Sequence, residues 1–98
     1  MRYQLTPSAA RDLDAIYGYI AQDNLRAAGR MLQRFLEAFR KLADQPGMGH
    51  LREDLTDEPF RFWSVGAYLI IYRPGTDPLE ILRVVHGSRD IASLLEEE

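Results

Sequence analysis

The sequence contains no cysteine, and this absence limits its chemistry. Disulfide bridges and thiolate metal sites are excluded, and nothing indicates an oxidising compartment. No apolar run approaches the roughly 20 residues of a membrane helix. The first residues, MRYQLTPSAARDLD, become charged at once and are unlike a signal peptide. We therefore expect a cytoplasmic protein without a membrane segment, folded as a single domain over residues 1–98.

Lysine is nearly absent as well: Lys41 is the only one, and the other cations are arginines. The net charge is −3, which argues against broad, non-specific binding of duplex DNA, because such binding uses many phosphate contacts. An acidic total does not exclude a local basic face. Arginine suits carboxylate and phosphate recognition, although genome composition is the simpler explanation of the bias.

Two amphipathic helices are predicted in the first half of the chain. Thr6 and Pro7 have the residue types of an N-cap and a first helical position. Apolar residues then recur at helical spacing at Leu13, Ile16, Tyr17 and Ile20. After a break at 22–24, Asn24 can cap a second helix, which ends at Pro46 and Gly47. Its apolar stripe consists of Ala28, Met31, Phe35, Phe39 and Leu42. The short link predicts an antiparallel helical hairpin.

The other regular segments are predicted strands. Residues 2–6 alternate polar and apolar side chains, which is typical of a short strand. After the loop PGMGHLREDLTDEPF, the period changes and predicts strands at Phe60–Val65, Ala67–Arg73 and Leu79–Val85. Their short connections favour antiparallel pairing. A last short helix is predicted at Ile91–Leu95, with Asp90 as its cap.

The predicted fold class is therefore α+β: an N-terminal strand and a helical hairpin packed on an antiparallel β-sheet, with a short C-terminal helix. The hairpin can cover one face of the sheet. The other face would then be partly open, and an open face on a small protein suggests a partner.

The stretch RVVHGSRD, residues 83–90, contains a histidine, a serine and an aspartate. A Ser-His-Asp site needs three convergent side chains, and residues this close in sequence rarely converge. The Gly-x-Ser-x-Gly elbow is also absent around Ser88. A structural interpretation fits better. Gly87 permits a turn after a strand, and His86 packs at the strand end. Ser88 or Asp90 then caps the next helix.

Metal and cofactor sites are not indicated. His50 and His86 are isolated histidines in different segments, which is a weak signal for a metal site. The GMG stretch at 47–49 lacks the Lys-Ser/Thr ending and the strand-to-helix context of a phosphate loop. We expect no metal and no cofactor.

Four arginines fall on or beside the predicted strands: Arg61, Arg73, Arg83 and Arg89. On an open sheet face they could contact an anionic peptide or a nucleic-acid backbone. Alternatively, they are solvated and pair with the nearby acids Glu80, Asp77 or Asp90. The spacing alone favours neither interpretation. Trp63 and Tyr68 are more typical of core or interface anchors than of base-stacking platforms.

Three motifs carry a resemblance to a known family. They are L-A-x-x-P-x-x-G at Leu42–Gly49, Y-L-I-I-Y-R at Tyr68–Arg73 and R-V-V-H-G-x-R-D at Arg83–Asp90. In this order and at this length, after the segment YQLTPSAARDLDAIYGYIA, they make the chain resemble the ParE toxins of the RelE/ParE superfamily. The likeness covers nearly the whole chain. The family fold, a helical hairpin on an antiparallel sheet, agrees with the predicted elements.

The resemblance implies a toxin of a bacterial type II toxin–antitoxin system. ParE-like toxins are non-enzymatic poisons of DNA gyrase that stabilise cleaved DNA–gyrase complexes. A ParD-like antitoxin would neutralise the toxin by folding its C-terminal segment along the toxin surface, in a heterotetramer or larger complex. Operator DNA would be reached only through the antitoxin.

The main alternative within the superfamily is a RelE-like nuclease that cuts mRNA on the ribosome. Several such nucleases carry an arginine where this chain has Leu69, and their lysine-rich approach to the ribosome is missing here. Arg89 matches a shared basic position and His86 could act as an acid or base, so the nuclease stays open as an alternative. A degenerate member that only binds antitoxin or regulates its operon is a third.

The polar cluster and the resemblance together predict target contacts at Arg83, His86 and Arg89. For the antitoxin, contacts are expected at Leu69, Ile71, Arg73 and Trp63. Residues 69, 71 and 73 share one face of their strand, while residues 68, 70 and 72 share the other. The sequence does not determine which of these faces the hairpin covers.

Overall fold

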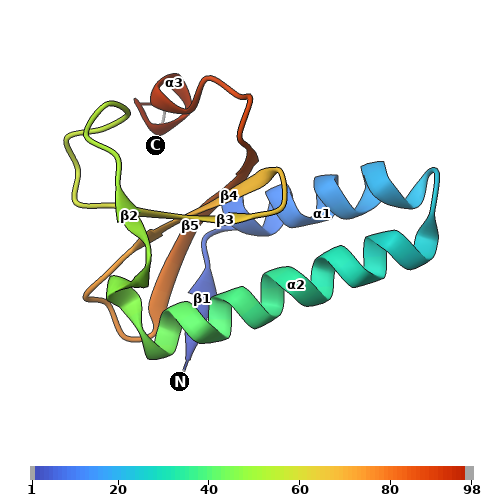
Figure 1. Cartoon of the computed structure of the whole chain (residues 1–98), viewed down its shortest axis with the longest axis horizontal. Coiled ribbons are helices and arrows are strands. Elements are labelled where there is room, and N and C mark those ends of the chain that lie inside the picture. Colours follow the sequence, from blue (N-terminus) through green and yellow to red (C-terminus); the bar gives the residue numbers. More distant parts are fainter. Residues whose placement is uncertain (1, 97–98) are drawn as a thin grey trace.

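The structure is a computed structural model that describes residues 2–96. Its elements, in chain order, are β1 (Tyr3–Leu5), α1 (Pro7–Ala21), α2 (Leu25–Asp44), a short 3-10 helix η1 (Pro46–Met48), β2 (His50–Leu51), β3 (Arg61–Val65), β4 (Tyr68–Arg73), β5 (Leu79–His86) and α3 (Ile91–Glu96). Figure 1 shows the two long helices side by side on one side of the sheet, with α3 on the other. The predicted α+β class is confirmed.

The sheet has the strand order β1-β5-β4-β3-β2. Strands β2 to β5 pair antiparallel with their neighbours, as their short connections predict. Strand β1 pairs parallel with β5. Parallel pairing needs a long connection, and the helical hairpin and the other strands lie between these two strands in the chain. The two-residue strand β2 lies in the segment that was expected to be a loop.

The helix caps form as the sequence predicts. The Thr6 hydroxyl oxygen accepts from the amide of Ala9 at 3.0 Å, and Asn24 Oδ1 accepts from the amide of Ala27 at 3.0 Å. The Thr6 hydroxyl also donates to the backbone carbonyl of Leu82 at 2.8 Å. The start of α1 is therefore fixed to β5.

The sheet face toward the hairpin, here called the first face, carries the main core. The side chains of Ile70 and Tyr72 point into this face and are fully buried. They pack with residues of both long helices, of which Leu13, Phe35, Phe39 and Leu42 are the larger ones. The hairpin thus covers the 68, 70, 72 side of β4, which answers the question the sequence left open.

The opposite face, here called the second face, carries a smaller core. Its buried members are Phe60, Phe62, Ile71, Val85 and Ile91. Ile91 belongs to α3, so the terminal helix covers part of this face (Figure 1). Ile71 has an exposed fraction of 0%. The second face is therefore more completely filled than the prediction of a partly open face implied.

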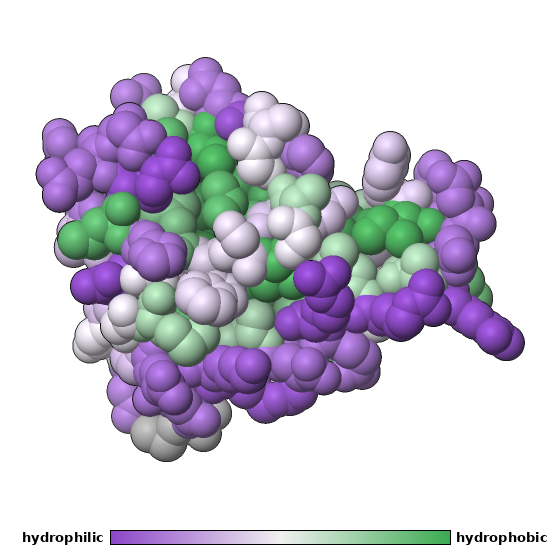
Figure 2. Space-filling model, in the orientation of Figure 1, coloured by the Kyte–Doolittle hydropathy of each residue, from purple (hydrophilic) through white to green (hydrophobic). Residues whose placement is uncertain are grey.

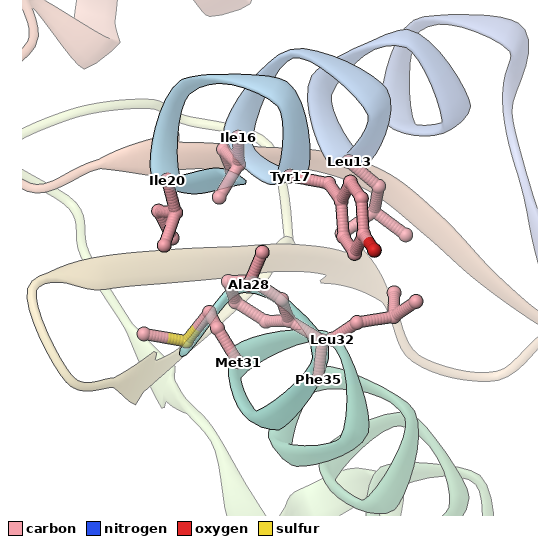
Figure 3. A pocket seen from close by; sticks show the side chains of 8 residues that line it. All are labelled: Leu13, Ile16, Tyr17, Ile20, Ala28, Met31, Leu32 and Phe35. Carbon is pink, nitrogen blue, oxygen red and sulfur yellow. The ribbon is translucent and has the colours of Figure 1, made fainter. Parts of the chain in front are cut away.

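The far end of the hairpin extends beyond the sheet (Figure 1). Figure 3 shows its apolar side chains pointing toward one another from α1 and α2. The space that they enclose is about 10 Å³, room for no more than one water molecule. This region is a packing seam between the helices. Among residues 2–96, no helix combines the length and apolarity needed to cross a membrane.

Candidate functional site

Two of the predicted target-contact residues, His86 and Arg89, lie at the end of β5 and in the turn that joins it to α3. The strand ends at His86, and the amide of Gly87 donates to the carbonyl of Ala67 at 2.8 Å. Asp90 then caps α3, because its Oδ1 accepts from the amide of Ser93 at 3.3 Å. The interpretation of RVVHGSRD as a strand end followed by a helix cap is confirmed.

The imidazole of His86 lies close to Ser88. Its Nδ1 accepts a hydrogen bond from the Ser88 amide at 3.1 Å and lies 2.7 Å from the Ser88 hydroxyl oxygen. Since Nδ1 is an acceptor, the neutral ring carries its proton on Nε2. The carboxylate of Asp90 is occupied by Ser93 instead of the imidazole. The pair is thus a local turn contact without the orienting carboxylate of a triad.

Arg83 does not point outward as expected. Its Nε and Nη2 donate to the two carboxylate oxygens of Asp12 on α1, at 2.7 and 3.0 Å. The Asp12 carboxylate also accepts from the amide of Val84 at 2.9 Å. The side chains of Arg83 and Asp12 are only 14% and 15% exposed. Arg83 therefore fixes α1 against β5, and its guanidinium is unavailable for a long reach to a target.

A β-bulge interrupts β5 next to Arg83. Tyr72 pairs with Ile81 and Ile71 pairs with Arg83, so Leu82 is an extra residue in β5. Its carbonyl accepts from the Thr6 hydroxyl. The bulge shifts the alternation of side chains by one position, and Leu82 and Val85 both reach the second face.

Two other sheet arginines are also occupied. Arg61 donates through Nη1 to the carbonyl of Gly49 at 2.7 Å. Arg73 pairs with Glu80 at 3.2 Å and lies over the ring of Phe60, 4.8 Å from its centre. Of the four arginines on or beside the strands, Arg89 alone has no hydrogen bond or ion pair from its side chain within the described chain.

The predicted antitoxin residues do not form one continuous surface. Leu69, Ile71 and Arg73 belong to the second face, but Ile71 is fully buried under α3. Trp63 pairs with Ile70 and packs against the core of the first face, where it stacks with His50. Trp63 is therefore separated from the other three by the sheet itself.

Two surface hollows lie next to these residues. The first, called the β5-end hollow, has a volume of about 390 Å³ and is lined by residues that include Tyr19, Tyr68, His86 and Arg89. The second, called the α3 hollow, has a volume of about 270 Å³ and is lined by Glu58, Phe60, Arg73, Leu82 and Leu95. His86 and Arg89 thus share one hollow, and Arg73 belongs to the other.

Tyr72 joins two of the motifs quoted above. Its hydroxyl donates to the carbonyl of Pro46 at 2.7 Å and accepts from the amide of Gly49 at 2.9 Å. A Cβ atom on Gly49 would lie 2.5 Å from this hydroxyl oxygen. The spacing of Pro46 and Gly49 therefore serves to enclose the buried phenol. Desolvation raises the pKa of Tyr72, although the Gly49 hydrogen bond acts in the opposite direction.

No metal site was found among residues 2–96: no three histidine or carboxylate side chains gather there in a metal-binding arrangement. The ring of His50 stacks beside Trp63, whereas the ring of His86 lies nearly perpendicular to that of Tyr68. The two histidines therefore have separate surroundings.

Comparisons with known proteins agree with this architecture. A family described as "ParE toxin of type II toxin-antitoxin system, parDE" matches residues 3–91. The chain is 29% identical over 91 residues to Toxin ParE3 of Caulobacter vibrioides, covering 92% of this chain and 90% of that protein. A solved structure titled "Chromosomal ParDE TA system from P. aeruginosa" has 26% identity and a TM-score of 0.69, covering 88% of this chain and 95% of that one. The chain belongs to the family of ParE toxins of type II toxin–antitoxin systems.

Proposed function

We propose that this protein stops growth by stabilising the cleaved DNA–gyrase complex, and that a ParD-like antitoxin neutralises it. The match to the ParE family over residues 3–91 is the observation that carries the proposal. In this mechanism the toxin acts as a rigid body that docks on larger machinery in the cytoplasm. Its own side chains make and break no covalent bond.

The β5-end hollow is the surface that we assign to the target. His86 and Arg89 are both exposed there, and Tyr19, which is 73% exposed, stands beside them on α1. An exposed aromatic ring next to an arginine is a common combination in binding hot spots. Arg83 takes part indirectly, because its bond to Asp12 holds α1, and with it Tyr19, against β5.

The α3 hollow is the surface that we assign to the antitoxin. It combines the apolar side chains of Phe60, Leu82 and Leu95 with the charged side chains of Glu58 and Arg73. An antitoxin segment that folds on binding needs both apolar burial and charge pairing. Leu69 and Ile71 belong to the same second-face core as Phe60, which lines this hollow. Operator DNA would be bound through the antitoxin, in a heterotetramer or larger complex.

A RelE-like nuclease is the second candidate, because one observation favours it. No hydrogen bond within the described residues reaches Nε2 of His86, and Arg89 lies in the same hollow. An imidazole and a guanidinium at one site could act as an acid and a charge stabiliser in RNA cleavage. The sheet arginines Arg61, Arg73 and Arg83 add nothing to such a site, because each is held by another partner.

Two assays of the purified toxin, run side by side, test the proposal. One measures gyrase supercoiling and scores trapped, cleaved DNA. The other measures the integrity of mRNA on translating ribosomes. Cleaved DNA with intact message is the expected result. Cut message with unaffected gyrase would replace the proposal by the nuclease.

A further inference from the structure

The solvent face of α2 carries a concentration of positive charge. Five of the twelve cations of the chain lie on this helix, and all five are exposed: Arg26, Arg30, Arg34, Arg40 and Lys41. We call these five residues the α2 basic face. Figure 2 shows hydrophilic side chains along the length of α2. Outside this face, the chain has seven cations against fifteen acids. The charge of the molecule is therefore strongly asymmetric.

The cations of the α2 basic face have no partners within the described chain. Elsewhere, Arg2, Arg52, Arg73 and Arg83 each pair with a carboxylate. No hydrogen bond or ion pair engages any of the five on α2 among residues 2–96, although Glu37 is exposed on the same helix. Five unpaired cations in an acidic protein leave a region of positive potential that a bound anion would neutralise.

The spacing of these cations suits a linear polyanion. Arg26, Arg30 and Arg34 are separated by four residues each, so about 6 Å of helix axis lies between successive guanidinium groups. At 3.6 residues per turn, all five cations fall within an arc of about 120°. The opposite side of α2 is buried in the core through Phe35, Phe39 and other apolar residues. The helix is thus held rigidly, with one basic stripe toward solvent.

The composition of the stripe favours a nucleic acid over a protein. Protein–protein interfaces have an apolar centre that is depleted in charge, whereas nucleic-acid interfaces are polar and strongly positive. The other exposed residues between Arg26 and Lys41 are Gln33 and one acid, Glu37, so this stretch of α2 has five cations against one acid. The exposed Leu25 precedes the stripe and lies about 100° away from Arg26 around the helix axis. No apolar anchor for a protein partner therefore lies within the arc.

From these observations we infer that the α2 basic face binds the phosphate backbone of duplex DNA. This inference rests on the proposed function for the identity of the duplex, which would be the DNA held by gyrase. The acidic segment 53–58 lies near α3, on the opposite side of the sheet from α2 (Figure 1). Repulsion between this segment and DNA would orient the toxin with α2 toward the duplex.

Duplex binding by full-length toxin tests the inference directly. The probe is a fluorescent DNA duplex of about 30 bp, titrated from about 50 to 200 mM salt. The stripe variant combines Arg26→Gln, Arg30→Gln and Arg34→Gln. The control variant removes the same charge from exposed arginines elsewhere, through Arg2→Gln, Arg11→Gln and Arg52→Gln. Circular dichroism confirms that both variants are folded.

The stripe variant should bind the duplex at least about tenfold more weakly. The salt slope, which is the slope of the logarithm of the binding constant against the logarithm of the salt concentration, should become shallower by about 0.9 for each phosphate that the protein no longer neutralises. The control variant should keep the slope of the wild type. Equal slopes in the two variants, or no binding by the wild type at about 50 mM salt, would overturn the inference. An RNA duplex of the same length that binds as tightly as DNA would also overturn it.

A gyrase assay separates this inference from the proposed function. If the wild type traps cleaved DNA, the stripe variant should trap much less than the control variant. Equal trapping by both variants would reject the role of the α2 basic face and leave the gyrase proposal intact. A wild type that traps nothing would reject the gyrase proposal, while the duplex titration still decides DNA binding. Loss of antitoxin affinity with unchanged DNA affinity would reassign the face to an acidic protein.

Discussion

The carboxylate of Asp12 accepts two hydrogen bonds from Arg83 across 71 residues of sequence. It also accepts the amide of Val84, so one side chain of α1 holds three donors of β5. Both charged side chains are mostly buried. A carboxylate in this position ties the helical hairpin to the sheet beside the β5-end hollow.

Asp12→Ala should lower the free energy of unfolding by about 2–3 kcal/mol, because it removes three hydrogen bonds, two from Arg83 and one from the Val84 amide. Urea denaturation measures the change. Asp54→Ala is the matched control: Asp54 pairs with Arg52 at 2.8 Å, but its side chain is 62% exposed. That loss should stay below about 1 kcal/mol. Similar losses in the two variants would contradict the structural role of Asp12.

Gly49→Ala should destabilise the protein by about 1–3 kcal/mol, because the new methyl group would overlap the Tyr72 hydroxyl. Gly29→Ala is the matched control. Gly29 lies inside α2 with no atom within 4 Å of a Cβ, so alanine there should raise stability by about 0.5–1 kcal/mol. Thermal unfolding of both variants measures whether each substitution lowers or raises the stability. A tolerated Gly49→Ala would show that the 46–49 segment shifts freely.

The buried phenol of Tyr72 predicts a dependence of stability on alkaline pH. Burial raises its pKa above the ordinary 10.0, so the unfolded chain releases this proton at a lower pH than the folded protein. Its contribution to stability is therefore complete below pH 10.0 and is lost as the pH rises above that value. In Tyr72→Phe this part of the alkaline fall should disappear. Stability at neutral pH should drop by about 1–2 kcal/mol, because the Gly49 amide loses its acceptor.

Urea unfolding at a series of pH values measures the effect, and Tyr19→Phe is its control. Because the Tyr19 side chain is 73% exposed, that substitution should leave both the slope and the neutral stability close to those of the wild type. If stability falls with rising alkaline pH equally steeply in Tyr72→Phe and in the wild type, the pKa of Tyr72 is not raised by folding.

Combined His86→Ala and Arg89→Ala should weaken growth inhibition at least about tenfold while the fold stays intact, because both side chains are exposed at the β5-end hollow. The readout is the colony count after induction of the toxin without antitoxin. Circular dichroism and the melting temperature confirm folding. Undiminished toxicity would remove these two residues from the target surface.

Combined Arg73→Ala and Leu82→Ala should weaken antitoxin binding at least about tenfold, because they remove a charge and an apolar side chain from the α3 hollow. Isothermal titration with a ParD-like antitoxin measures the affinity. Arg2→Ala provides a control, since Arg2 is exposed and its Asp77 pair lies at the other end of β5, at the β4–β5 turn. Equal affinities for the double variant and the control would place the antitoxin elsewhere.

Local signals predicted most of the fold. The caps at Thr6 and Asn24, the helical periods and the strand-forming runs are short-range features, and each element formed close to its predicted bounds. The short connections also predicted which strands pair antiparallel. These features follow from the backbone preferences of neighbouring residues, which a sequence displays directly.

The directions of several side chains could not be predicted. Strict alternation places Val85 on the same face as Ile81, but the bulge at Leu82 shifts the pattern, and Val85 belongs to the core of the second face. The Asp12–Arg83 pair joins residues far apart in sequence, so its spacing carries no local signal. In contrast, the repeat of Arg26, Arg30 and Arg34 was visible in the sequence, and the structure adds that these residues have no partners among those described.

The position of β1 has a consequence for synthesis of the protein. Strand β1 is made before the other strands of the sheet, yet its neighbour is β5, which ends at His86. The N-terminal strand and the carboxylate of Asp12 therefore wait for the last strand to leave the ribosome before they find their partners. A nascent chain cannot complete this sheet until β5 has been made, and a product that terminates before β5 would lack the finished sheet.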